Sequence, residues 1–193
     1  MFIRAFVSYC LLSIILSCPA GAKGPFGSIH LGQWVGGAYT NDTTGAFSHC
    51  AAQVPYNRGI VLLVGMRADR QWTLGFLRPA WKFTPGETIP IGLTFDGREQ
   101  FNVFGEAQTI PGFVVVLMPQ NSALLNQFRK ANGMTAFTKG NAFTLALTST
   151  SQLMPVLAHC VDRMNRGGMR AAGDFSIATA APPAPQPTPA PQA

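Results

Sequence analysis

Two histidine–cysteine pairs are the residues of this chain that could bind a metal ion or supply a nucleophile and its base. They are Ser48-His49-Cys50 and Ala158-His159-Cys160. If the two cysteines meet, the four side chains could form a Cys₂His₂ zinc site, because zinc favours these ligands. However, adjacent side chains point to opposite faces of a strand and diverge on a helix, so each pair converges poorly on one metal. We therefore predict a Cys50–Cys160 disulfide and no metal site.

Catalytic motifs are absent from the sequence. A cysteine–histidine nucleophile pair needs a free thiolate, and the predicted disulfide would use both thiols. There is no G-x-S-x-G motif, no P-loop and no G-x-G-x-x-G motif. Most acidic residues lie in or beside predicted turns, where exposed carboxylates are expected. We predict no catalytic residues, no cofactor and no enzymatic activity.

Aromatic and basic residues are the candidates for ligand binding. Trp34, Trp72 and Trp81 could line a groove, although aromatic residues at strand spacing more often form the core. Arg163 and Arg166 follow the polar side of the last predicted helix. They could contact anionic lipid or polysaccharide, or simply complement the helix carboxyl end. Basic residues elsewhere are scattered singly, so nucleic-acid binding is not expected.

The first 22 residues have the pattern of a cleavable signal peptide. Met1–Arg4 carry one positive charge, Ala5–Leu16 are mostly apolar, and Ala20-Gly21-Ala22 supply small residues before Lys23. The apolar run is too short to span a membrane, which takes about 20 residues. A second possibility is lipidation of Cys18 in Ile15-Leu16-Ser17-Cys18. The sequence therefore predicts a periplasmic or secreted protein without a transmembrane helix in its mature chain; contact with a membrane surface stays possible.

Composition and cysteine usage fit an exported single domain. The net formal charge is +6, with 11% charged and 47% hydrophobic residues, and removal of Arg4 lowers the charge by one. Cys10 and Cys18 leave with the signal, so Cys50 and Cys160 remain as a pair in an oxidising compartment. A loop of about 110 residues closed by this bridge would gain roughly 4–5 kcal/mol in the chain-entropy model.

Short apolar runs separated by turn residues predict strands over most of the chain. Asp96-Gly97 between two such runs indicates a tight hairpin. We expect strands at Gln33–Thr40, Ala46–Val54, Gly59–Met66, Gln71–Leu77, Thr88–Phe95, Gln100–Phe104, Gly112–Met118 and Ala142–Leu147.

Two helices are expected between and after these strands. Ala123–Asn132 is capped by Asn121 or Ser122, and the second helix runs from about Ser149–Ser151 to Asn165. Pro155 should delay the start of the second helix or kink it.

This order of elements predicts a mainly β, α+β fold. The architecture is an antiparallel β-sandwich or a strongly bent sheet with two packed helices, because strands and helices do not alternate regularly. The expected organisation is a signal peptide at 1–22, an N-terminal arm at 23–32, a globular domain at 33–166 and a disordered Gly then Pro/Ala-rich tail at 167–193.

Several features recur along the chain at a particular spacing: Trp34, His49-Cys50-Ala51, Ile60–Gly65, Leu74-Gly75-Phe76, Pro79, Gly86, Asp96-Gly97, Phe143-Thr144-Leu145 and Thr148-Ser149. This spacing resembles the invasion-associated locus B family of exported proteobacterial proteins. The resemblance implies a compact β-rich domain with an envelope or secreted accessory role linked to host-cell entry. It implies no catalytic residues.

Two functions from different classes follow. The first is a non-catalytic exported module that binds an envelope component or a protein partner, with a link to host interaction. The second is a small periplasmic hydrolase without a recognisable motif. A deep polar cleft with a histidine beside a carboxylate, away from the cysteines, would favour the hydrolase. An open face with an apolar rim would favour the binding module.

Overall fold

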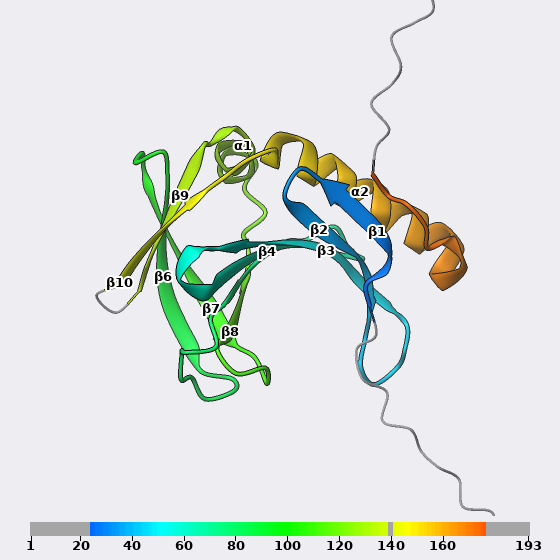
Figure 1. Cartoon of the computed structure of the whole chain (residues 1–193), viewed down its shortest axis with the longest axis horizontal. Helices are drawn as coiled ribbons and strands as arrows, with labels where there is room; N and C mark the ends of the chain where they lie inside the picture. Colours follow the sequence, from blue (N-terminus) through cyan, green and yellow to red (C-terminus); the bar gives the residue numbers. More distant parts are fainter. Residues whose placement is uncertain (1–23, 139–140, 177–193) are drawn as a thin grey trace, which may run out of the picture.

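A computed structural model of the chain describes residues 24–138 and 141–176. Within them, ten antiparallel strands form one continuous sheet in the order β1-β2-β3-β4-β5-β8-β7-β6-β9-β10. The sheet is not closed, and it bends strongly between the β1–β3 end and the β6–β10 end (Figure 1). The strands are β1 Phe26–Leu31, β2 Trp34–Thr40, β3 Phe47–Tyr56, β4 Ile60–Arg67, β5 Trp72–Leu77, β6 Thr88–Phe95, β7 Gln100–Ala107, β8 Phe113–Leu117, β9 Gly133–Thr138 and β10 Asn141–Ala146.

Two α-helices pack on this sheet, α1 at Ser122–Lys130 and α2 at Thr150–Gly167. Two short 3₁₀ helices, η1 at Asn57–Gly59 and η2 at Gly168–Ala171, complete the elements described. The predicted fold class is confirmed, and of the two architectures the bent single sheet is the one observed. The Asn121 side chain caps α1 by accepting from the N–H groups of Ala123 and Leu124, at 2.9 and 3.2 Å.

The core lies on the face of the sheet that the helices cover. Strand residues alternate between faces, and the inner face carries long apolar side chains, including Leu62, Leu74 and Val116, that are fully buried. From α1 and α2 the core receives Leu124, Phe128, Leu153 and Leu157, also buried. This face therefore supplies the hydrophobic stabilisation of the fold.

The predicted disulfide is confirmed. Cys50 on β3 bonds to Cys160 on α2, with a Cα–Cα distance of 6.2 Å and a sequence separation of 110. Both cysteines are fully buried on the inner side of the sheet. The bridge therefore fastens the last helix to the third strand.

The domain is larger at both ends than the sequence indicated. Strand β1 lies inside the segment predicted as an N-terminal arm. The expectation that the tail begins at residue 167 was wrong for residues 168–176, because η2 follows α2 directly and Phe175 is fully buried. The signal peptide, and the Pro/Ala-rich residues from 177 onward, lie outside the described residues.

The segment after η2 closes the β1 edge of the sheet. The Ser28 N–H donates to the Gly173 carbonyl at 2.9 Å, and the Phe175 N–H donates to the Ser28 carbonyl at 2.8 Å. Gly27 has a φ of 65°, and a Cβ there would lie 2.3 Å from the Gly173 oxygen, so the close approach requires glycine.

Two further sequence expectations needed correction. Strand β9 was missed, and α2 neither starts late nor is interrupted at Pro155. Pro155 lies on the exposed side of α2, where water can bond the helix carbonyl that the proline leaves without a donor.

Candidate functional site

The face of the sheet opposite the helices contains an open groove, which we call the outer groove. It crosses β3, β4, β5 and β8, ends against β7, and has a volume of about 890 Å³. The strand register places Gln53, Leu63, Gly75, Val115 and Glu106 in one row on this face. The groove is therefore assembled from residues far apart in the sequence by strand pairing alone.

Small residues form the floor of the outer groove. Ala51 lies beside Gly65 on the neighbouring strand, and Gly75 on β5 pairs with Leu63, one step diagonally from Gly65. A Cβ on Gly75 would lie 2.9 Å from the Phe113 ring, and a Cβ on Gly65 would lie 2.6 Å from the Thr73 hydroxyl oxygen. The two glycines therefore leave room for the Phe113 and Thr73 side chains to lie over the sheet.

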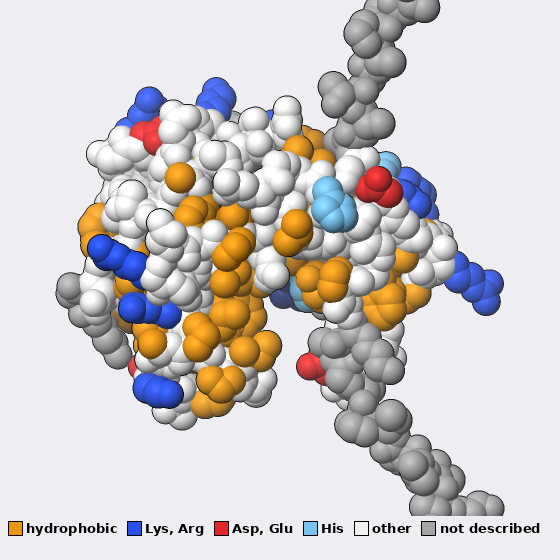
Figure 2. Space-filling model, in the orientation of Figure 1, with side chains coloured by type: hydrophobic (Ala, Val, Ile, Leu, Met, Phe, Trp, Pro, Cys, Tyr) orange, Lys and Arg blue, Asp and Glu red, His pale blue; other side chains and the backbone are white. Residues whose placement is uncertain are grey.

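The rim of the outer groove on the β7–β8 side is apolar and exposed. Phe104 is 68% exposed and Leu117 is 49% exposed, and both line the groove together with half-buried Phe113 and Phe47. Figure 2 shows hydrophobic side chains gathered in a column in the region where Figure 1 draws β7 and β8. Exposed apolar side chains that gather along a groove are typical of binding surfaces.

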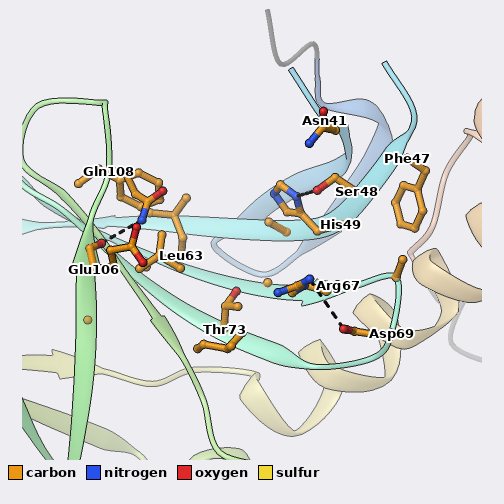
Figure 3. Close-up of a pocket in the computed structure, with 18 of the residues that line it drawn as sticks. Asn41, Phe47, Ser48, His49, Leu63, Arg67, Asp69, Thr73, Glu106 and Gln108 are labelled. Carbon is orange, nitrogen blue, oxygen red and sulfur yellow. Dashed lines mark hydrogen bonds and ion pairs between the residues drawn. The ribbon is translucent and has the colours of Figure 1, made fainter. Parts of the chain in front are cut away.

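Polar side chains lie along the two sides of the groove. Figure 3 shows His49 and Arg67 on one side, from β3 and β4, and Glu106 and Gln108 on the other, from β7 and the turn after it, with Thr73 between them. The Arg67 guanidinium lies 3.8 Å from the Asp69 carboxylate. Both side chains are more than half exposed, so this ion pair stabilises the fold little.

His49 is the histidine of the groove, and its surroundings oppose protonation. Its Nδ1 lies 3.1 Å from the Ser48 hydroxyl, and its ring stacks on Tyr39 with centroids 5.1 Å apart. Burial lowers the pKa of His49, the nearby Arg67 lowers it further, and Asp42 partly offsets both. Within 24–138 and 141–176, no carboxylate lies within 4 Å of this imidazole. Among the described residues, His49 therefore has a hydroxyl and an aromatic ring as its direct partners.

The tryptophans predicted as binding residues do not line the outer groove. Trp34 and Trp72 are 1% and 4% exposed, so this prediction was wrong for both. The Trp34 indole N–H donates to the Thr148 carbonyl at 2.7 Å, and Trp72 packs on Phe128. Trp81 is half-buried elsewhere, beside Phe143.

The two predicted arginines differ from each other. Arg163 donates to the carbonyls of Asp174 and Ala171 at 2.8 and 3.0 Å, and its guanidinium lies 5.1 Å from the centre of the Phe175 ring. It therefore holds the C-terminal segment against α2. Arg166 is exposed on the same helix. Neither residue reaches the outer groove.

The cysteines and histidines do not converge on a metal. Cys50 points to the core, whereas His49 next to it faces the outer groove, and His159 is exposed on α2. In the part of the chain that the structure describes, no group of three His, Cys, Asp or Glu residues could hold a metal ion.

Sequence reasoning missed the residues that form the apolar rim. Phe104 and Leu117 were assigned to predicted strands, but nothing local told which strands would be neighbours. The available signal was alternation along each strand. Phe104 directly follows the buried Val103, and Leu117 directly follows the buried Val116, so both lie on the face opposite the core.

No family model, curated protein or solved structure matches this chain. Among the described helices, none is both long and apolar enough to cross a membrane.

Proposed function

We propose that this protein is an exported, non-catalytic module that binds a cell-envelope component or another protein through the outer groove. One observation carries the proposal: Phe104 and Leu117 are exposed along an open groove on a face that the helices leave uncovered. Large exposed apolar side chains are unfavourable in water, and burying one against a partner contributes about 1.5–3 kcal/mol.

The shape of the groove favours an extended ligand. The floor runs across three strands over Ala51, Gly65 and Gly75, and the polar groups lie along its two sides. Such an arrangement offers apolar contact along its length and single hydrogen bonds from groups such as Thr73 and Gln108. These features are typical of recognition and not of bond cleavage.

Export is the second part of the proposal. The signal-like residues 1–22, the Cys50–Cys160 disulfide and the resemblance to the invasion-associated locus B family all support it. In this compartment the natural partners are envelope components, secreted proteins and host surfaces. A host-interaction role rests on the resemblance alone.

Retention on the native cell-envelope fraction tests the proposal. Leu117→Glu and Phe104→Glu should weaken retention at least about tenfold, because each places a charge where an apolar contact is expected. Ile110→Glu is the matched control, since Ile110 is 55% exposed just before β8 but does not line the groove. Equal retention of all three variants and the wild-type protein would exclude the outer groove as the binding site.

A further inference from the structure

The two edges of the sheet differ in how their backbone groups are paired. At the β1 edge, residues 173–175 bond to Ser28 on both its N–H and its carbonyl. At the other edge, among the residues that the structure describes, β10 pairs only with β9. An unpaired edge is a template for adding another strand.

The hydrogen bonds around β9 fix which groups of β10 point outward. The Leu147 N–H donates to the Asn132 carbonyl at 2.8 Å, so odd-numbered residues of this strand direct their backbone groups toward β9. Because backbone direction alternates along an antiparallel strand, Ala142, Thr144 and Ala146 direct theirs away from the sheet. The bond from Asp96 N–H to the Gly133 carbonyl, on the opposite side of β9, agrees with this alternation.

Two residues of β10 therefore present open backbone groups. The Ala146 carbonyl accepts a hydrogen bond from the Tyr56 hydroxyl. Ala142 and Thr144 are exposed, and among the described residues nothing bonds to their outward N–H and carbonyl groups. The strand Asn141–Ala146 contains no charged residue and no proline, which are the usual devices that keep an edge from pairing.

Aromatic side chains lie beside this edge on both faces of the sheet. On the inner side, Phe143 contacts Trp81, with ring centroids 5.4 Å apart, and the Arg78 guanidinium lies 5.9 Å from the Phe143 ring centre. On the outer side, Phe137 is 39% exposed opposite Ala142, next to a shallow hollow of about 490 Å³. A strand added here would find apolar surface for its side chains on either face.

The surroundings of the β10 edge are basic. The Arg78 guanidinium lies over the Phe143 ring, and the exposed Lys82 follows Trp81, which contacts the same ring. The exposed Arg58 lies in the turn after Tyr56, whose hydroxyl bonds to the Ala146 carbonyl at the end of β10. The described residues of β10, of turn 56–60 and of loop 78–83 include no Asp or Glu. Figure 2 shows mostly Lys and Arg among the charged side chains on this half of the molecule. Charge complementarity thus favours an acidic occupant.

We propose that the β10 edge is a second binding site, which takes an extended acidic segment of a partner protein as an added antiparallel or parallel strand. Its backbone would pair with Ala142 and Thr144, and its carboxylates would face Arg78, Lys82 and Arg58. The chain's own C-terminal residues are a poor occupant, because prolines at 182, 183, 185, 187, 189 and 191 lack the N–H groups that a ladder needs.

The test uses a short synthetic peptide that alternates valine and glutamate, with both ends blocked. Binding is followed by calorimetry, and pairing by hydrogen exchange of the Ala142 and Thr144 amides. These two amides should exchange more slowly in the presence of the peptide. A peptide N-methylated at alternate residues should not bind, and binding should be weaker for a valine–lysine peptide or at high salt.

Thr144→Pro removes one outward N–H without touching a bond to β9, and an edge strand tolerates proline there. Loss of this bond should weaken peptide binding at least about fivefold, as expected for roughly 1 kcal/mol. The matched control is Thr144→Val, which keeps the backbone N–H and loses the same side-chain contact with Thr135. It should bind the peptide as the wild-type protein does.

Leu117→Glu should also leave peptide binding unchanged, which separates this site from the outer groove. Three results would overturn the proposal: no binding at millimolar peptide, equal binding of the N-methylated peptide, or equal effects of Thr144→Pro and Thr144→Val. Protection of Ala142 and Thr144 by protein concentration alone would instead assign the edge to a second copy of this chain.

Discussion

The two faces of the central strands β3, β4, β5 and β8 are built from the same segments but differ in kind. Each strand sends alternate residues to the two sides, and Leu62 is fully buried while its neighbour Leu63 lines an open groove. The inner face is covered by helices and joined to α2 by a disulfide. The outer face keeps Phe104 and Leu117 exposed. The stability of the fold explains why the inner face is apolar. It does not explain the exposed apolar side chains of the outer face, which therefore indicate a binding surface.

Removal of the disulfide, which belongs to the inner face, should have the largest effect on the stability of the protein. Cys160→Ser should lower the free energy of unfolding by about 2–5 kcal/mol, because a long loop in the unfolded chain is no longer closed. Urea denaturation followed by circular dichroism measures this. Hydrogen exchange should show α2 opening before the central sheet. A variant as stable as the wild-type protein under oxidising conditions would show that the inner face does not depend on the bridge.

Shortening the two adjacent leucines separates the faces directly. Leu62→Ala should cost about 2–5 kcal/mol of stability, because it leaves a cavity in the core. Leu63→Ala should cost roughly 1 kcal/mol, since Leu63 is only half-buried and its loss leaves an open groove rather than a closed void. Retention on the envelope fraction should fall for Leu63→Ala and stay unchanged for folded Leu62→Ala. Equal losses of stability would mean that the outer face is also core.

A fall in pH should lower the stability of the protein through the outer face, which carries the titratable His49. The buried polar residues of the described chain are Thr40 and Thr150, whose hydroxyl groups do not titrate in this range. The pKa of His49 is lowered in the fold, so the unfolded chain takes up this proton first as the pH falls below about 6.5. Stability should therefore decrease from pH 7.5 to 5.5, and His49→Gln should reduce that decrease.

Neighbouring charges give this pH effect two controls of opposite sign. Arg67→Gln should raise the pKa of His49 and Asp42→Asn should lower it, since Arg67 opposes protonation and Asp42 favours it. Titration of the His49 imidazole by NMR measures both shifts. A His49 pKa at or above 6.5 in the wild-type protein would contradict the account.

Local patterns in the sequence predicted most of the inner face. Alternation and Asp96-Gly97 located eight strands, and the bond was predicted because Cys50 and Cys160 are the two cysteines that remain after the signal. Strand β9, which begins directly after the predicted helix Ala123–Asn132, was missed. Strand β1 was missed because Gly27 and Ser28 weaken its apolar alternation. The segment up to Ser176 was assigned to a tail because its glycines and alanines give no strand or helix period, although Phe175 is buried in the fold.

The outer groove could not be predicted because it depends on non-local pairing. Strand β8 lies next to β5 across a gap of some 35 residues in the chain, as the pairing of Leu74 with Val116 shows. Without knowledge of that pairing, the sequence does not predict that Gly75 and Val115 lie in one row, or that Phe104 lies at the rim of a groove. Trp34 and Trp72 were candidates for binding by residue type alone, and strand register assigns both to the core.

Site-specific photocrosslinking in living cells tests whether a partner binds in the outer groove. A photoreactive phenylalanine analogue is placed at Leu117 on the groove rim, and in a separate variant at Ile110, a similarly exposed position that does not line the groove. We expect a discrete adduct from position 117 that Phe104→Glu abolishes, and no adduct from position 110. Absence of an adduct at 117, or equal adducts at both positions, would contradict the assignment of the outer groove as the binding surface.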